Sequence, residues 1–566
     1  MEKVYKNIKK PIEYIGVGLS SILFLVLHLR LYDEILGAPY TKGGDADFHY
    51  IMVRTIQKTG WIFDNPQLGS PKSSTIYDVP QGGDNFHWLA MKIISYFTSA
   101  VQTVNLYFIL SFALVSIAAY GASRWWGLAR ISSYVIAILY AFLPYHFYRG
   151  QNHLLLSMYF VIPLVIVFAF KSCSSNEKIN RYLLIAFSAL VASTGAYYFI
   201  FSLLLFIIAI IFNLINKNRH RIKQQLIFVG VSMLVFIFNQ LPTIIYILKN
   251  GSNSSAAVRN VADAESYGLQ ITDMFMPRVD HRIPKFASLA NIVYSSGIPS
   301  EAGQSIGIVA SLGVIGLLLF GITKIIQSNP IPEKFKYFLI TLPVIIFFTV
   351  SSGPTLVLGI LGFTQIRSWN RVVVIIAFIG LLCFGYFSES IKPKLKMEHA
   401  NYAFVAIMIL ILIVGFFDLT SNADRFSSKA NYVTMKNNCD FVKAIEKQNA
   451  KNNNVFQFPY IKYPEGGDIN ELKHYDQAMY ILCDANLDYS FGAMVGRDDQ
   501  LQEKIASKKV LKPEDIAKLK SNKFSIIEID RNGYKDYGKA IEKLLIQEFG
   551  EPILNADGSN AAYIID

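Results

Sequence analysis

Apolar segments long enough to cross a membrane recur along most of this 566-residue chain. A transmembrane helix needs about 20 mainly apolar residues. Eleven segments approach or reach this length: roughly 12–32, 103–122, 131–147, 154–170, 182–196, 198–215, 226–248, 304–324, 337–351, 371–387 and 401–418. Only 17% of the residues are charged, against about 25% in soluble proteins. The sequence therefore predicts a polytopic α-helical membrane protein with about eleven spans, the first of them retained because no small-residue cleavage site follows it.

The basic residues are distributed unevenly between the two sides of these spans. They gather in alternate short loops: Lys3, Lys6, Lys9, Lys10, Arg124, Arg130, Lys171, Lys178, Arg181, Lys217, Arg219, Arg221, Lys223, Lys324, Lys334, Lys336, Lys392, Lys394 and Lys396. Short cytoplasmic loops are enriched in Lys and Arg, so the N-terminus is expected in the cytoplasm. An odd number of spans then places the long loops 33–100 and 249–303, and the C-terminus, outside. The net charge of +12 thus reflects membrane orientation and not nucleic-acid binding.

The last part of the chain, 420–566, has no further apolar span and is expected to be a separate α/β domain. Helical spacing runs over 440–447 and 539–549, and strand-like alternation over 455–459, 524–530 and 561–565. We therefore divide the chain into a membrane module, 1–419, and an outer soluble domain, 420–566. Cys439 and Cys483 both fall in the outer domain, where oxidation is permitted, but the sequence alone leaves their pairing open.

The stretch Gly43 to Tyr50 follows directly on the first span and carries Asp45, Asp47 and His49. Two carboxylates and an imidazole are thus expected just outside the membrane. One interpretation is that Asp45 and Asp47 mark an active site. The other is that Gly-Gly-Asp caps a surface helix and the charges are solvated, since Asp is common at helix N-termini.

Five polar clusters are expected on the same outer face. They contain Asp45, Asp47, His49 and Arg54; Asp84 and His87; Tyr145, His146, Arg149 and His153; Asp273, Arg278, His281 and Arg282; and Arg367, Asn370 and Arg371. A carboxylate can take a proton from an acceptor hydroxyl as a general base. Clustered Arg and His suit a phosphate, because guanidinium groups form charged hydrogen bonds with its oxygens. This combination at headgroup depth favours transfer from a lipid-phosphate donor.

Two other interpretations use the same residues. Asp45 and Asp47 could hold a divalent cation, although two carboxylates two residues apart are a weak signal. A transporter also carries charges in the membrane, but the spans here contain almost no acidic residues. The position of the charges favours surface chemistry over translocation.

The acidic motif after the first span, the long first outer loop and the soluble outer domain together resemble the C-type superfamily of glycosyltransferases (GT-C), which use polyprenyl-phosphate sugars. Short stretches at 68–72, 77–80, 272–277, 367–371 and 458–460 are similar to bacterial and phage-type glucosyltransferases that modify O-antigen or cell-wall polymers. The resemblance implies a GT-C-like membrane fold and a multi-pass protein of the bacterial inner membrane with a periplasmic C-terminal domain.

The resemblance also implies a hexosyltransferase reaction. A sugar, expected to be glucose, would move with inversion from an undecaprenyl-phosphate donor to a hydroxyl of O-antigen lipopolysaccharide or another surface glycan. Asp45 would be the base, and Asp47 would orient the acceptor or share the proton. Arg278, Arg282, Arg367 and Arg371 are candidates for binding the donor phosphate, and His281 and His87 are weaker candidates.

No metal is expected, because arginines can stabilise the leaving phosphate. Expected functional partners are a donor synthase and a donor flippase. The alternatives are a transporter or flippase for lipid-linked glycans and a non-enzymatic assembly protein.

Overall fold

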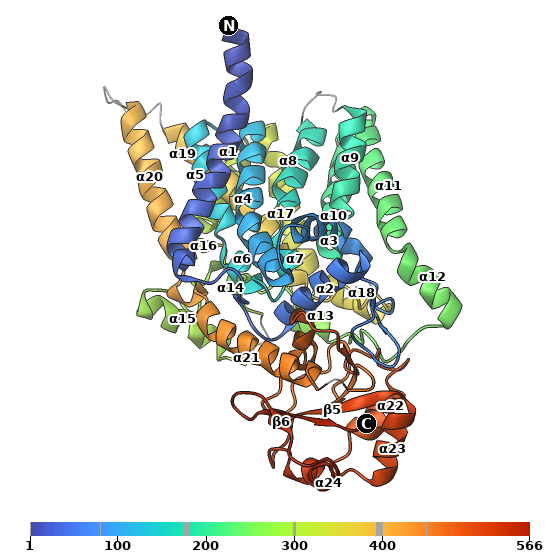
Figure 1. The fold of residues 1–566 in the computed structure, drawn as a ribbon. Coiled ribbons are helices and arrows are strands. Elements are labelled where there is room, and N and C mark those ends of the chain that lie inside the picture. Colours follow the sequence, from blue (N-terminus) through green and yellow to red (C-terminus); the bar gives the residue numbers. More distant parts are fainter. Residues whose placement is uncertain (1, 80, 175–179, 298–300, 392–399, 449) are drawn as a thin grey trace.

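The computed structural model describes residues 2–79, 81–174, 180–297, 301–391, 400–448 and 450–566. Pro80, Lys178, Lys392, Lys394 and Lys396, named above, lie outside these residues. Long helices form a bundle, with the N-terminus at one end and the α/β domain at the other (Figure 1). The helices of the bundle are α1 (Glu2–Leu29), α4 (Ala100–Trp126), α5 (Arg130–Ala141), α6 (Pro144–Arg149), α8 (Val161–Ser174), α9 (Arg181–Val191), α10 (Ala196–Ile215), α11 (Ile222–Asn239), α16 (Gly307–Ile326), α17 (Glu333–Thr349), α19 (Val373–Ile391) and α20 (Ala400–Leu419).

Each of the eleven expected apolar segments coincides with helix in the structure. Among the described residues, eight helical stretches are long and apolar enough to cross a membrane, and α5 and α6 together make one of them. The apolar helices Val161–Cys173, Arg181–Val191 and Phe335–Thr349 are shorter. The polytopic helical fold is therefore confirmed, whereas the count of eleven spans stays a prediction.

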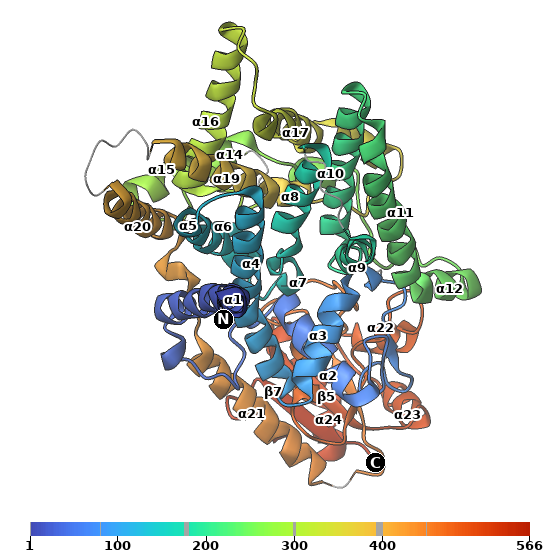
Figure 2. The same cartoon turned by 90° about the horizontal axis from the view of Figure 1, so that it is seen from above.

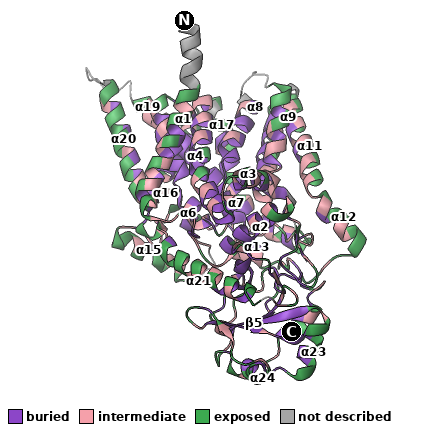
Figure 3. Ribbon diagram, viewed as in Figure 1, coloured by how far each residue is buried: buried purple, intermediate pink, exposed green. Residues whose placement is uncertain are grey.

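Burial separates the centre of the bundle from its rim (Figure 3). The side chains of α19 are buried from Val373 to Cys383, whereas α1 exposes Ile12, Leu19 and Leu23. Apolar side chains exposed around the rim are what contact with lipid requires. At the centre, α16 and α19 touch through Gly313 and Gly380, since a Cβ on Gly313 would lie 1.8 Å from the Gly380 carbonyl oxygen. Small residues permit such close approach of membrane helices.

The first outer loop folds between the bundle and the α/β domain (Figure 1). It contains η1 (Leu31–Asp33), α2 (Asp45–Thr59), the two-stranded pair β1 (Asp64–Asn65) and β2 (Ser74–Thr75), η2 (Gly82–Asp84) and α3 (Asn85–Ser95). Gly43 and Gly44 have φ angles of 89° and 61°, a region that glycine adopts at little cost. The chain turns sharply at these glycines, and α2 starts at Asp45.

The remaining outer segments are short helices at the same end of the bundle. They are α7 (Leu154–Ser157), α12 (Leu241–Asn250), α13 (Asp263–Ser266), α14 (Ile271–Phe275), α15 (Pro284–Tyr294), α18 (Pro354–Ile360) and η4 (Trp369–Val372). At the opposite end, η3 (Arg219–Arg221) precedes α11.

The outer domain contains a five-stranded sheet in the order β4-β3-β5-β7-β6. Strands β3 (Asn454–Phe458), β4 (Asp488–Tyr489) and β5 (Phe524–Asp530) are parallel, and β7 (Asn560–Ile564) pairs antiparallel with β5 and with β6 (Ile553–Leu554). Helices α22 (Gln500–Ala506), α23 (Pro513–Ser521) and α24 (Lys539–Phe549) accompany the sheet. The expected strands and the 539–549 helix are all present. The helix expected over 440–447 is the end of the longer α21 (Ser428–Glu446).

The outer domain is joined to the membrane module by several direct contacts. Asn431 of α21 donates to the Pro39 carbonyl at 2.9 Å, and the Ser70 amide donates to the Tyr489 carbonyl at 2.9 Å. Cys439 and Cys483 form a disulfide that ties α21 to the end of η7 (Asp476–Leu482). The pairing that the sequence left open is thus present.

Candidate active site

Asp45 lies at the first position of α2. One side of this residue is open to solvent, but protein atoms crowd its carboxylate. The pKa of Asp45 is raised above its usual range, first by this loss of hydration and then by the carboxylate of Glu465, while His474, Arg371 and Arg367 lower it. A carboxylate with a raised pKa is a stronger base than a free one. The structure thus gives Asp45 neighbours from both the membrane module and the outer domain.

Asp47 has a different environment two residues further along α2. Its side chain is fully buried, one oxygen accepts a hydrogen bond from the Gly43 amide at 3.0 Å, and the other has no partner. Burial and the nearby Asp476 raise the pKa of Asp47 to about 7, although the Gly43 amide and Lys42 oppose this shift. The expectation of a solvated cap is therefore wrong for Asp47, because its carboxylate braces the glycine turn from inside.

Arg371 is a buried cation close enough to Asp45 to lower its pKa. It belongs to η4, at the start of the span that continues as α19, and its side chain is 8% exposed. The guanidinium carbon lies 4.1 Å from the centre of the Tyr197 ring. Among the described residues, no side chain forms an ion pair or hydrogen bond with this guanidinium. The carboxylates of Glu301, Asp84 and Asp45 act on Arg371 only from a distance, and its buried Nε has no hydrogen-bond partner. A buried polar group without a hydrogen bond is costly, so an anionic ligand would stabilise this site.

Arg149, Glu301 and Asn370 form a hydrogen-bonded group beside Arg371. Arg149 pairs with one carboxylate oxygen of Glu301, and the Asn370 amide donates to the other at 2.8 Å. The Arg149 and Arg371 charges hold the pKa of Glu301 down at about 2, despite partial burial. Glu301 was not among the predicted residues. It lies in the second loop outside every polar cluster, so nothing in the sequence around it indicated a role.

The Gly82–Asp84 turn packs on the break between α9 and α10. The Gly195 amide donates to the Gly83 carbonyl at 2.7 Å, and a Cβ on Gly195 would lie 3.3 Å from an Asp84 carboxylate oxygen. Burial raises the pKa of Asp84 to about 7, with Arg371 opposing the shift. The break between α9 and α10 thus brings Asp84 within the electrostatic range of Arg371.

The side chains of His49 and His87 are buried, that of His153 is half-buried, and all three are uncharged near neutral pH. Burial lowers the pKa of His49 and of His87 to about 4 and that of His153 to about 3. His87 shares a hydrogen bond of 2.7 Å with the Tyr107 hydroxyl, and the His49 ring stacks near Trp88. Neutral imidazoles can donate hydrogen bonds, but they add no positive charge for a phosphate.

Several predicted residues are engaged elsewhere. Arg278 uses its guanidinium on Asp280, on Asp424 and on the Leu419 carbonyl. Arg282 donates to Thr420 and contacts His28, and His28 lies 2.9 Å from Asp424. Both arginines thus fasten the second loop to the ends of α1 and α20, which does not favour a role at a donor phosphate, and their assignment to the phosphate stays a prediction.

The other predicted residues divide between the site and its surroundings. Arg54 pairs with Asp484 of the outer domain at 2.7 Å, at the far end of α2 from Asp45, and its role stays a prediction. His281 Nε2 lies 3.6 Å from Asp418 Oδ1, so His281 also contacts the end of α20. Asp273 is buried in α14. Arg367 pairs with Asp263 at 3.2 Å but keeps a third of its side chain exposed, and it remains close enough to Asp45 to lower that pKa.

The acidic residues of α2 do not form a chelating pair. Asp45 interacts with Glu465 and Arg371, whereas Asp47 faces Gly43 and Asp476. Among the described residues, no group of three or more His, Cys, Asp or Glu side chains has the arrangement of a metal site.

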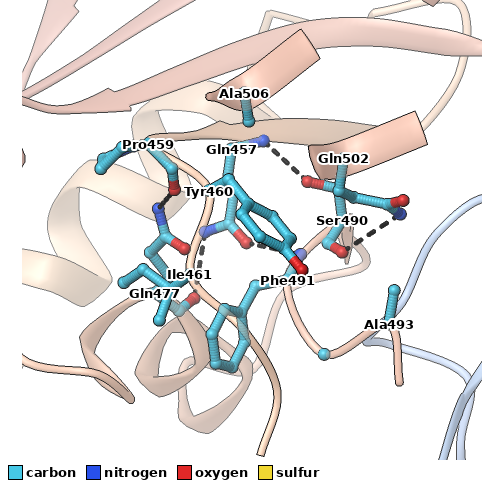
Figure 4. Close-up of a pocket in the computed structure, with 11 residues that line it drawn as sticks. Gln457, Pro459, Tyr460, Ile461, Gln477, Ser490, Phe491, Ala493, Gln502 and Ala506 are labelled. Carbon is cyan, nitrogen blue, oxygen red and sulfur yellow. Dashed lines mark hydrogen bonds between the residues drawn. The ribbon is translucent and has the colours of Figure 1, made fainter. Parts of the chain in front are cut away.

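A small hollow in the outer domain is lined by three glutamines, Gln457, Gln477 and Gln502, with Tyr460 and Phe491 (Figure 4). Their amides are mostly used within the wall: Gln457 donates to the Gln477 carbonyl and Gln477 to the Pro459 carbonyl, each at 3.0 Å. The free volume of about 10 Å³ is roughly what one water needs. This hollow cannot admit a sugar, so the site at Asp45 remains the candidate.

Comparison with solved structures finds similar chains at low sequence identity. The chain is similar to arabinofuranosyltransferase AftD from Mycobacteria with a TM-score of 0.54 and 11% identity, covering 98% of this chain and 41% of AftD. It also matches the oligosaccharyltransferase AglB from Archaeoglobus fulgidus, solved with an inhibitory peptide and a dolichol-phosphate, with a TM-score of 0.46, 12% identity and coverage of 97% and 74%. A second Archaeoglobus fulgidus oligosaccharyltransferase structure, with a tethered acceptor peptide, matches with a TM-score of 0.48 and 12% identity. This match covers 98% of this chain and 74% of the other. No curated protein matches the chain by sequence.

The helical bundle, its outer loops and the α/β domain thus define a polytopic membrane protein of the GT-C-like fold. Residues 22–367, more than half of the chain, match the family described as "Domain of unknown function (DUF6311)". The protein belongs to this family.

Proposed function

We propose that this protein is an inverting membrane glycosyltransferase. It transfers a sugar, with glucose as the first to test, from undecaprenyl phosphate to a hydroxyl of O-antigen or another cell-surface glycan. The fold shared with the arabinofuranosyltransferase AftD is consistent with this reaction. The observation that carries the proposal is the arrangement of Asp45, a carboxylate open to solvent, with the buried and unpaired Arg371 close enough to influence its pKa.

Asp45 is the proposed general base. Its carboxylate removes the proton of the acceptor hydroxyl while the hydroxyl oxygen forms a bond with the anomeric carbon of the sugar. The bond between this carbon and the phosphate oxygen breaks, and lipid phosphate leaves with the bonding electrons. The raised pKa of Asp45 brings the base nearer to neutral pH, where general bases are most effective.

Arg371 is the proposed ligand of the donor phosphate. Its buried guanidinium would bind the phosphate oxygens and stabilise the negative charge that grows as the sugar departs. Arg149, Glu301 and Asn370 hold the wall beside Arg371 through their mutual hydrogen bonds. Asp47 acts as a positioning residue, because its bond to the Gly43 amide fixes the turn that presents Asp45. Because Arg371 supplies positive charge, we propose that transfer needs no metal ion.

The proposed setting is the bacterial inner membrane, with the N-terminus in the cytoplasm and the site and outer domain in the periplasm. A donor synthase and a donor flippase would then supply the lipid-linked sugar on the outer side. A flippase for lipid-linked glycans would instead need charged residues on both sides of the bundle to act on its cargo.

The test is sugar transfer by the full-length protein in membranes that contain undecaprenyl phosphate carrying radiolabelled glucose. Incorporation of label into a surface glycan, unchanged by EDTA, is the expected result. Loss of transfer in EDTA would overturn the metal-independent mechanism. Movement of the intact donor across the membrane without sugar transfer would identify a flippase.

A further inference from the structure

A large cavity lies at the far end of α2 from Asp45. Its volume is about 690 Å³. The lining comes from the last turns of α2, from α3, from the first turn of α4, from Met435 of α21 and from Leu482 and Asp484 of the outer domain. From above, α2 and α3 lie next to the lower part of α4 (Figure 2). None of the residues proposed to act on the sugar lines this cavity.

The cavity wall is positively charged. Arg54, Lys58 and Lys92 line it, and Asp484 is its one carboxylate among the described lining residues. Asp484 already pairs with Arg54 at 2.7 Å. No described carboxylate lies within ion-pair distance of Lys58 or Lys92, and Lys92 instead donates to the Gly60 carbonyl at 2.8 Å. Two ammonium groups in the wall are therefore left without a counter-ion.

The first turn of α4 adds to this positive field. Ser99, Ala100 and Val101 line the cavity, and α4 begins at Ala100 with Ser99 as its cap. The backbone amides at a helix N-terminus carry partial positive charge and favour anions. Lysines from α2 and α3 and the start of α4 thus converge on one space, and an anionic group suits it.

Helix α3 divides its surface into three strips. Trp88, Met91 and Ser95 are buried in the protein. Lys92 and Tyr96, one turn apart, line the cavity. Leu89 and Ile93 of α3, with Phe97 in the turn that follows the helix, form an exposed apolar strip, with exposed fractions of 51%, 55% and 85%. Residues four apart lie on the same face of a helix, so the apolar strip runs directly beside the strip that lines the cavity.

We propose that this cavity binds the phosphate headgroup of an outer-leaflet lipid with net negative charge, whose hydrocarbon chain lies along Leu89, Ile93 and Phe97. The lysines and the α4 N-terminus recognise the phosphate, and the exposed strip of α3 continues the lipid-facing surface of the bundle. A free phosphate would use the first feature only, whereas a phosphate-bearing lipid uses both. The site is separate from Asp45 and does not depend on the proposed reaction.

The test is lipid binding to the full-length protein in detergent, measured by native mass spectrometry. The probes are phosphatidylglycerol, phosphatidylcholine with the same chains, undecaprenyl phosphate and inorganic phosphate. We compare wild type with Lys58→Gln and with Lys58→Gln/Lys92→Gln. Lys249→Gln is the matched control, since Lys249 is an exposed lysine of α12 that does not line the cavity. Ile93→Ser tests the apolar strip without changing charge.

The two anionic lipids, phosphatidylglycerol and undecaprenyl phosphate, are expected to bind wild type and Lys249→Gln alike, and phosphatidylcholine more weakly. Affinity should fall about fivefold in Lys58→Gln and about thirtyfold in the double variant, from the usual contribution of one lysine near a lipid phosphate. Ile93→Ser should weaken the binding of both anionic lipids. The tighter binding of either phosphatidylglycerol or undecaprenyl phosphate then shows whether the ligand is a bulk phospholipid or a prenyl carrier. Equal binding of phosphatidylcholine, equally tight binding of inorganic phosphate, or unchanged affinity in both lysine variants would overturn the proposal.

Discussion

Two buried arginines on the outer face have opposite surroundings. Arg278 is held by Asp280 and Asp424, whereas Arg371 stacks on Tyr197 and has no ion pair in the described part of the chain. Removing one partner of a buried ion pair leaves an uncompensated charge and destabilises the fold. A buried cation with no partner instead suits a ligand that brings its own negative charge.

Substitution of each arginine by glutamine should therefore have different effects on activity and stability. Arg371→Gln is expected to lower the rate of sugar transfer about 10²–10³-fold, as when a group that stabilises transition-state charge is removed. Its thermal stability should stay close to that of wild type. Transfer rates and thermal unfolding of the purified variant check this, and full activity of Arg371→Gln would contradict the assigned role.

Arg278→Gln is the comparison. Loss of this guanidinium leaves Asp424 buried without its main partner, so the free energy of unfolding should fall by about 3–5 kcal/mol. The expected result is a lower Tm and a lower yield of folded protein. The folded fraction should transfer sugar at nearly the wild-type rate. A selective loss of donor binding in the stable fraction would return Arg278 to the list of phosphate ligands.

The sequence supports prediction of residue types at the site better than prediction of their partners. Asp45 and Arg371 follow from clusters at the ends of apolar segments. The diversion of Arg278 and Arg282 could not be foreseen, because Asp424 and Thr420 are more than a hundred residues away in the chain. Glu301 was missed for the same reason, since only the folded chain brings it to Arg149 and Asn370.

At the scale of elements, α2 connects the membrane module to the outer domain. Asp47 of α2 lies near Asp476 of η7, and Asp530 at the end of β5 lies near Asp476 as well. Burial raises the pKa of Asp47 and of Asp530 to about 7, with Asp476 adding to both shifts. Lys42, 3.5 Å from Asp476, is the cation that opposes these shifts.

These shifts make the stability of the interface depend on pH. The folded-state pKa of Asp530, about 7, lies above its unfolded value of about 4. The folded state therefore keeps a proton that the unfolded state releases, and stability falls as pH rises from about 4 to 7. Asp530→Asn removes this loss, so the variant should be more stable than wild type at pH 8 by about 1–3 kcal/mol. Thermal unfolding of both proteins at pH 5 and pH 8 measures this, and equal declines would contradict it.

The disulfide gives the outer domain a second, covalent constraint. Cys439 and Cys483 are separated by 44 positions, and a native disulfide of this kind contributes about 2–4 kcal/mol. The Cys439→Ser/Cys483→Ser variant should unfold at lower temperature than wild type, and a reductant should affect only wild type. If a reductant leaves the wild-type Tm unchanged, the bond contributes little.

At the scale of the whole molecule, the periodic apolar segments were sufficient to predict the bundle and the α/β domain. Each expected span coincides with helix, because 20 apolar residues have few other stable arrangements in a bilayer. The docking of the outer domain on the first loop was not predictable. It depends on backbone contacts such as the Ser70 amide to the Tyr489 carbonyl, which carry no signal in side-chain type.

Membrane orientation is a prediction at this scale. A membrane-impermeant maleimide applied to intact cells should label Lys535→Cys in the outer domain and leave Lys217→Cys, between α10 and α11, unlabelled. Both positions are exposed, and the native free cysteines, Cys173 and Cys383, are buried. Cell lysis should make Lys217→Cys reactive. Labelling of Lys217→Cys in intact cells would reverse the orientation.

The most direct test of the account is the rate of sugar transfer by Asp45→Asn, measured beside wild type with the same labelled undecaprenyl-phosphate donor. Asparagine keeps the size of the side chain but cannot take a proton. Transfer should fall about 10²–10⁴-fold, as expected for loss of a general base, while donor binding and thermal unfolding stay near wild type. Wild-type transfer by a folded Asp45→Asn protein would contradict the claim that α2 presents the base.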